Sequence, residues 1–135
     1  MTVPAHRLQA LPLFSTLSEE EREAVGRLFE VRRVSPGTRL TLEGASGYSF
    51  FVIEEGTVEV ERAGRLLETL GPGDFFGEAA ILTGERRNAS VTAASDATLF
   101  VLFGTEFRVL EAELPSAAEQ IKQKMLERAA RATSG

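Results

Sequence analysis

Glu78 and Arg87 are the two charged residues whose sequence context favours ligand chemistry. Both lie in residues 70–91, where glycines at 71, 73 and 77 allow close approach of the backbone to a ligand. The guanidinium of Arg87 can pair two phosphate oxygens in a fork geometry. Glu78 is itself an anion, so it can instead accept a hydrogen bond from a sugar hydroxyl. A ligand that carries both a phosphate and a hydroxyl would satisfy this pair.

The same segment predicts a short helix that would help to bind an anion. Phe76–Leu82 has the length of one or two helical turns, and its free N–H groups would face whatever lies at its N-terminal end. Arg87 follows Glu78 by nine residues, beyond this helix. We therefore expect an anion cradle built from backbone N–H groups and one arginine.

The composition excludes most catalytic and metal-binding classes. The chain has 135 residues, 43% of them hydrophobic and 26% charged, which is typical of one globular domain. It contains no cysteine and one histidine, His6, so thiolate metal sites, cysteine nucleophiles and a convincing catalytic triad are not expected. No apolar run approaches the roughly 20 residues that cross a bilayer. We expect a cytoplasmic protein with no metal, no catalytic residues and no membrane contact.

The charge distribution argues against broad nucleic-acid binding. The formal net charge is −5, and residues 41–110 carry five arginines against eleven acidic residues. Binding to a polyanion or to an anionic membrane requires a basic face, and the negative net charge argues against such binding. An anion bound in the middle of the chain must therefore be held by a few local groups.

Two kinds of element would position the candidate residues. Ser18 and Glu21 form a capping-box pattern that begins a helix of about 19–29. From Phe29 to Phe103, β-branched and aromatic runs alternate with glycine-containing turns, which predicts an antiparallel sandwich or barrel of about eight short strands. Six of these strands are Thr38–Glu43, Tyr48–Glu54, Thr57–Glu61, Arg65–Leu70, Ser90–Ala94 and Thr98–Phe103.

The last thirty residues predict two helices. Thr105 can cap a helix that begins at Glu106, and Pro115 would end it, because proline disfavours helix at the preceding residue. Residues 116–119 form a second capping-box pattern, which predicts a final helix from 117 to about 131. The apolar stripe of this helix is Ile121, Met125 and Leu126.

The glycine-rich segment resembles a known family. Gly71-Pro72-Gly73-Asp74-Phe75-Phe76-Gly77-Glu78, followed by Arg87-Asn88-Ala89-Ser90-Val91, is similar to the phosphate-binding cassette of cyclic nucleotide-binding domains. These domains occur in catabolite activator proteins, regulatory subunits of cAMP-dependent protein kinase and cyclic nucleotide-gated channels. The likeness runs from Pro12 to Phe107, so it covers most of the chain.

The resemblance implies a fold of mainly β structure with flanking helices. This fold is an antiparallel double-stranded β-helix, or β-roll, of jelly-roll type. It implies a single domain over residues 1–135, with a helical start at about 3–29 and a β-roll at about 30–103. The cassette would occupy residues 71–91, and two C-terminal helices would occupy about 106–131.

The resemblance also implies how a cyclic nucleotide would be bound. Glu78 would hold the ribose 2′-hydroxyl and Arg87 the cyclic phosphate, and backbone amides would complete the shell near Gly77, Ala79, Ala80, Asn88 and Ala89. Met125 is the side chain that we expect to touch the base as a lid. Arg86 leaves a one-residue ambiguity in register, although the spacing favours Arg87. Asn88 is unusual at its position, so the choice between adenine and guanine stays open.

We therefore expect a sensor module that binds a cyclic nucleotide, cAMP before cGMP, and repositions its C-terminal helices. It would not be an enzyme, and it would not bind DNA directly, because only 20 residues follow Pro115 and a helix-turn-helix does not fit in them. The C-terminal helix could contact a partner protein or a second copy. The alternative is a degenerate domain of the same fold that serves as a scaffold or senses another effector. The sequence leaves open whether the chain is a full protein or a fragment.

Overall fold

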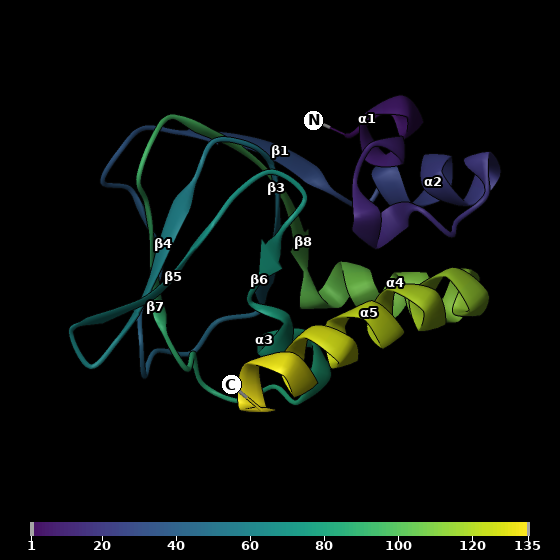
Figure 1. The fold of residues 1–135 in the computed structure, drawn as a ribbon. Coiled ribbons are helices and arrows are strands. Elements are labelled where there is room, and N and C mark those ends of the chain that lie inside the picture. The colour runs from purple at the N-terminus through teal and green to yellow at the C-terminus, as the bar shows by residue number, and fades with distance from the viewer. Residues whose placement is uncertain (1, 135) are drawn as a thin grey trace.

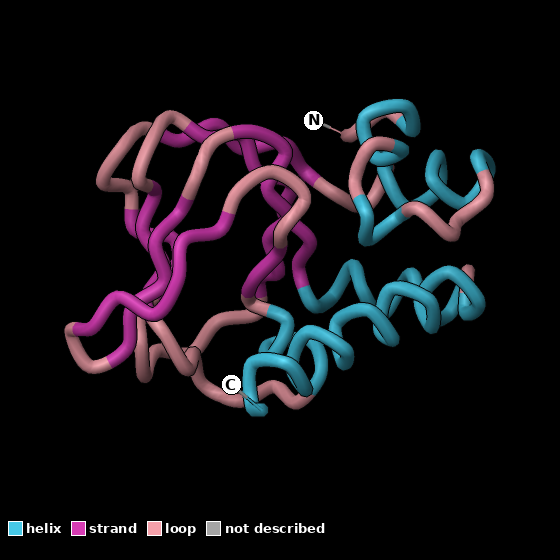
Figure 2. Tube along the Cα trace, in the orientation of Figure 1, coloured by secondary structure: helices cyan, strands magenta, loops and turns pink. Residues whose placement is uncertain are grey.

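The computed structural model describes the backbone of residues 2–134, and the side chains of these residues apart from positions 80 and 129–134. Strands gather on one side of the molecule and helices on the other (Figure 2). This arrangement confirms the predicted fold of mainly antiparallel β structure with flanking helices.

Eight strands in the described residues form two four-stranded sheets (Figure 1). One sheet has the order β1-β8-β3-β6 and the other β2-β7-β4-β5, with antiparallel pairing throughout. The strands are β1 (Glu30–Val34), β2 (Arg39–Thr41), β3 (Ser49–Glu55), β4 (Val58–Arg62), β5 (Arg65–Leu70), β6 (Phe75–Phe76), β7 (Ser90–Ala93) and β8 (Ala97–Phe103).

The β3 and β8 strands are buried on both faces, which explains their continuous apolar sequences. Successive side chains of a strand point to opposite faces of its sheet. Phe50 and Leu102 therefore pack with the helices, whereas their neighbours Phe51 and Val101 pack inside the β-roll. The sheet thus joins two hydrophobic cores and forms a rigid wall between the helices and the roll.

The N-terminal helices are α1 (Ala5–Gln9), the 3₁₀ helix η1 (Pro12–Phe14) and α2 (Glu19–Gly26). The predicted capping box is present: the Glu21 amide donates to Ser18 Oγ at 3.1 Å, and the Ser18 amide donates to Glu21 Oε1 at 2.8 Å. The α2 helix ends at Gly26, three residues before the predicted end. Gly26 accepts a hydrogen bond from the Val3 amide at 2.9 Å, and a Cβ at Gly26 would lie 2.0 Å from the Val3 carbonyl oxygen.

The C-terminal helices are α4 (Gly104–Glu113) and α5 (Pro115–Ser134), and both begin earlier than the sequence predicted. The Gly104 amide donates to the Tyr48 carbonyl at 2.8 Å, so α4 begins at Gly104, and Thr105 lies inside the helix rather than capping it. Pro115 both separates the two helices and begins α5, where its missing N–H costs no helical hydrogen bond. The predicted second capping box at 116–119 is therefore wrong.

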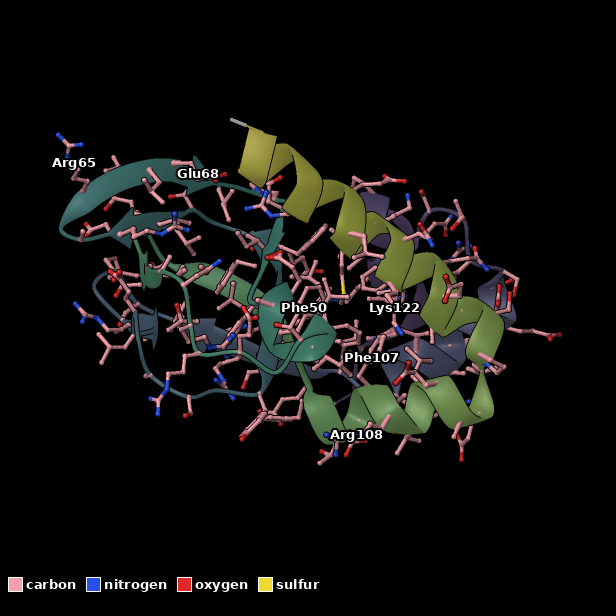
Figure 3. All side chains as sticks on the ribbon, turned by 90° about the horizontal axis from the view of Figure 1, so that it is seen from below. Phe50, Arg65, Glu68, Phe107, Arg108 and Lys122 are labelled. Carbon is pink, nitrogen blue, oxygen red and sulfur yellow. The ribbon has the colours of Figure 1, made fainter. Side chains whose placement is uncertain are left out.

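The two C-terminal helices pack against each other. Lys122 of α5 lies over the ring of Phe107 of α4, with its Nζ 6.0 Å from the ring centroid (Figure 3). Lys122 also forms an ion pair with Glu111 of α4 at 2.9 Å. Further along α5, Lys124 donates to the Pro12 carbonyl at 2.8 Å, which ties α5 to the N-terminal helices. In residues 2–134, no helix has both the length and the apolar character needed to cross a membrane.

The turn between β3 and β4 lies close to the turn between β7 and β8, and two turn glycines provide a matched test of this contact. Gly56 and Gly64 have φ of +88° and +77°, in the region that costs other residues about 1–2 kcal/mol. A Cβ at Gly56 would also lie 2.3 Å from the Asp96 carbonyl oxygen, whereas nothing lies within 4 Å at Gly64. We predict that Gly56→Ala lowers the free energy of unfolding by about 1–3 kcal/mol more than Gly64→Ala, measured by urea denaturation. Equal losses would contradict the close approach of the two turns.

Candidate ligand-binding site

A cavity of about 890 Å³ lies between the β4–β5 hairpin, the cassette and the C-terminal part of α5. The cassette contains β6 and α3 (Glu78–Leu82) and leads into β7. The cavity wall includes the predicted residues Gly77, Glu78, Ala79, Arg87, Asn88 and Ala89. Ala80 belongs to the backbone of α3, and its side chain lies outside the described residues. The fold therefore gathers the predicted site around one cavity.

The guanidinium of Arg87 is anchored by two backbone carbonyls. Its Nη2 donates to the Ser49 carbonyl at 2.8 Å, and its Nη1 lies 3.5 Å from the Gly77 carbonyl at the limit of a hydrogen bond. Burial lowers the pKa of Arg87, and the negative charge of Glu78 acts in the opposite direction. Arginine nevertheless stays protonated in proteins. The site thus contains a fixed, half-buried positive charge.

Arg86 lies on the outside of the same loop. It is exposed, and its Nη1 donates to the Gly44 carbonyl at 3.0 Å. Unlike Arg87, it is not part of the cavity wall. This difference favours Arg87 as the inward-facing arginine.

Asn88 is exposed at the cavity rim. Its backbone carbonyl accepts a hydrogen bond from Arg62 Nε at 2.8 Å.

Glu78 begins α3 and is largely buried, with 18% of its side chain exposed. Gly77 precedes it with φ of +83°, the left-handed conformation that glycine adopts without strain. Oε2 of Glu78 is buried and accepts no hydrogen bond from the described residues. Burial raises the pKa of Glu78, and the positive charge of Arg128 opposes this shift. Glu78 is therefore a buried acceptor with capacity for a hydroxyl donor.

Arg128 of α5 is a cavity residue that the sequence analysis did not identify. Its Nε lies 3.5 Å from Glu78 Oε2, and its Nη2 lies 3.6 Å from Oε1 of Glu68 on β5. Figure 3 shows Glu68 on the strand that faces the end of α5. The guanidinium also lies over the ring of Phe75, 5.6 Å from its centroid. A signal for Arg128 was present, because it falls seven residues after Ile121 and three after Met125, on the apolar face of the helix.

Met125, the predicted lid, is placed differently by the structure. Its side chain is fully buried in the core that joins the helices to the outer face of the β1-β8-β3-β6 sheet. Met125 is not part of the cavity wall, whereas Arg128, one turn further along α5, is. The apolar side chain is buried with other apolar groups, and the charged one reaches the cavity beside Glu78.

The family of this chain is shown by comparison with known proteins. Residues 31–113 match the family model described as "Cyclic nucleotide-binding domain". This match covers more than half of the 135 residues, and the chain belongs to that family. Domains of this type also occur in catabolite activator protein and in kinase regulatory subunits, which confirms the resemblance seen in the cassette.

Three similar proteins illustrate the range of the family. A cyclic nucleotide-gated potassium channel of Rhizobium etli is 36% identical over 119 residues, which are 88% of this chain and 33% of the channel. A cAMP-dependent protein kinase regulatory subunit of Hypocrea atroviridis is 33% identical over 103 residues, 76% of this chain and 22% of that protein. The crystal structure of Thermus thermophilus catabolite activator protein has a TM-score of 0.80 and 31% identity, covering 90% of this chain and 60% of that one. The chain spans a third or less of the channel and of the kinase subunit.

The raised pKa of Glu78 predicts a dependence of stability on pH. The folded state binds this proton more tightly than the unfolded chain, so the contribution to stability is present at low pH. It is lost as pH rises from the ordinary value of 4.5 through the raised pKa. Glu78→Gln removes this loss. We predict that its free energy of unfolding, relative to that of the wild type, increases from about pH 4 to about pH 7 in urea denaturation. A difference that stays constant over this range would contradict the burial of the charge.

Proposed function

We propose that the chain binds a 3′,5′-cyclic nucleotide, preferentially cAMP, in the cavity between Arg87 and Glu78. One observation carries this proposal: an anchored guanidinium and a buried carboxylate oxygen that receives no hydrogen bond from the described side chains belong to the same cavity wall. The cyclic phosphate would pair with Arg87, and the ribose 2′-hydroxyl would donate to Glu78. Backbone amides near Gly77, Ala79, Ala80, Asn88 and Ala89 would complete the shell.

Similarity to a protein that depends on cAMP supports the proposed preference for cAMP. The kinase regulatory subunit that is 33% identical to this chain is cAMP-dependent by name. cGMP remains the second ligand to test, because Asn88 at the cavity rim can both donate and accept hydrogen bonds. We propose binding without catalysis, since the single histidine, His6, belongs to α1 and is not part of the cavity wall.

We further propose that α5 responds to the ligand through Arg128. A 2′-hydroxyl that donates to Glu78 would share this carboxylate with Arg128, which sits at its Oε2. Ligand binding would thereby change the interaction that fixes this part of α5 to the cassette and to β5. Arg128, rather than Met125, is thus the residue of α5 in the cavity wall. A contact between Met125 and the base stays a prediction.

The output of the module would pass through the same helix. Leu126 of α5 is 45% exposed although its neighbour Met125 is fully buried, so the helix presents an apolar group to solvent. This exposure is consistent with the proposed contact to a partner protein or a second copy. We propose that residues 1–135 act as one cytoplasmic domain, a regulatory unit like those that form part of the longer relatives.

Calorimetric titration tests the proposed ligand and the proposed arginine together. We predict that cAMP binds and that 5′-AMP binds far more weakly, because the acidic middle of the chain repels the additional negative charge. Arg87→Ala should weaken cAMP binding by about 1.5–3 kcal/mol, the contribution of a hydrogen bond to a charged group. Arg86→Ala, the matched control, removes an exposed arginine and should change it little. Equal affinities for cAMP and 5′-AMP would reject the function, and the reverse ranking of the variants would reject the register.

Hydrogen exchange with and without cAMP tests the response of α5. The stability of α5 depends on the surface against which it packs. A changed contact at Arg128 should therefore change how often the backbone hydrogen bonds of α5 open. We predict that ligand increases the protection of backbone amides at 118–128. Amides of Leu99 and Val101 on β8, which are buried inside the β-roll and are not part of the cavity wall, are the internal control and should change little. Protection confined to residues 77–91 would show that the module binds ligand without a response of α5.

A further inference from the structure

The loop between β2 and β3 is attached to the backbone of Arg87. The Gly44 amide donates to the Arg87 carbonyl at 2.8 Å, and the Arg87 amide donates to the Ala45 carbonyl at 2.9 Å. These two hydrogen bonds fix the loop beside the arginine. The next residues of the loop therefore run past the Arg87 side chain.

The Arg87 side chain lies close to two glycines, one in this loop and one in the cassette. A Cβ at Gly47 would lie 2.6 Å from Nε of Arg87, 2.8 Å from Nη2 and 3.0 Å from Cζ. A Cβ at Gly77 would lie 2.9 Å from Nη1. All of these distances are shorter than the separation of about 3.5–4.0 Å at which nonbonded heavy atoms pack. The guanidinium thus occupies space that two side chains would otherwise fill.

The absence of a side chain at Gly47 is not explained by the backbone. Gly77 has φ of +83°, which by itself favours glycine, but Gly47 is not among the glycines with positive φ. A left-handed backbone conformation therefore does not account for the glycine at position 47. The three atoms nearest to a Cβ at Gly47 all belong to Arg87. The nearest neighbours of a side chain at position 47 would therefore be atoms of the arginine.

We infer that Gly47 is a positioning residue for the phosphate-binding arginine. Because Gly47 has no side chain, the guanidinium can lie against the loop and donate to the Ser49 carbonyl at 2.8 Å. A methyl group at this position would push the flexible end of Arg87 away from that carbonyl. The fold would be spared, because a side-chain end moves more easily than a backbone. This inference rests on the proposed function for its effect on affinity, but the displacement of Arg87 does not.

The first test is a titration of Gly47→Ala with cAMP. We expect a loss of affinity of about tenfold to a hundredfold, because the charge-assisted pair with the phosphate is misplaced. Gly104→Ala is the matched control: Gly104 also has no positive φ, it lies outside the cassette, and the atoms nearest to its Cβ would be the carbonyl oxygen and Cβ of Tyr48 at 3.5 and 3.7 Å, which are ordinary packing distances. Gly104→Ala should change affinity less than about twofold, and both variants should keep the thermal midpoint of the wild type. An unchanged affinity in Gly47→Ala overturns the inference.

A double-mutant cycle separates positioning from a general structural effect. In the background of Arg87→Lys, which lacks the planar group, Gly47→Ala should weaken cAMP binding less than about twofold. The same loss in both backgrounds would show that Gly47 acts independently of Arg87 and would overturn the inference.

A ligand-free measurement distinguishes failure of this inference from failure of the proposed function. The Nε–Hε signal of Arg87 can be assigned by NMR from its disappearance in Arg87→Lys. We expect this signal to shift in Gly47→Ala and to stay in place in Gly104→Ala, whatever the protein binds. An unshifted signal overturns the positioning role, whereas a shifted signal in a protein that does not bind cAMP overturns only the proposed ligand.

Discussion

The half-buried guanidinium of Arg87 constrains the structure around it, because a charge removed from water must keep its hydrogen bonds. It is anchored by the carbonyl of Ser49, which begins β3, and by the carbonyl of Gly77, which precedes α3. β3 is in turn fixed by burial on both faces. The position of one positive charge at the cavity thus depends on the burial of β3 on both faces of its sheet.

A second group of charges connects this rigid part to the C-terminal helix. Arg128 lies between the carboxylates of Glu78 and Glu68, so one side chain of α5 contacts both the cassette and the β4–β5 hairpin. Burial disfavours the charged form of Glu78 and raises its pKa, and the positive charge of Arg128 partly opposes this effect. A hydroxyl that donates to Glu78 would alter the same balance, and this is how we propose that ligand binding reaches α5.

The sequence was sufficient where a local pattern determines the structure. Glycine spacing and strand alternation predicted an antiparallel sandwich or barrel, the resemblance to the family implied the β-roll, and the cassette pattern predicted residues that share one cavity. The helix before Pro115 ends as predicted, but Pro115 also begins α5, two residues before the predicted start, because proline is compatible with the first position of a helix. Arg128 and Gly47 were missed because their roles come from contacts across the fold. Arg128 meets residues 50 and 60 positions earlier in the chain, and Gly47 meets an arginine 40 positions later.

The central claim is that one cyclic nucleotide bridges Arg87 and Glu78, and a crystal structure of the protein with cAMP tests it most directly. The account predicts phosphate oxygens within about 3 Å of the Arg87 guanidinium and the ribose 2′-hydroxyl within about 3 Å of the Glu78 carboxylate. It also predicts that Arg87 keeps its hydrogen bond to the Ser49 carbonyl. A nucleotide bound in the cavity without contact to Arg87, or bound elsewhere on the molecule, would contradict the account.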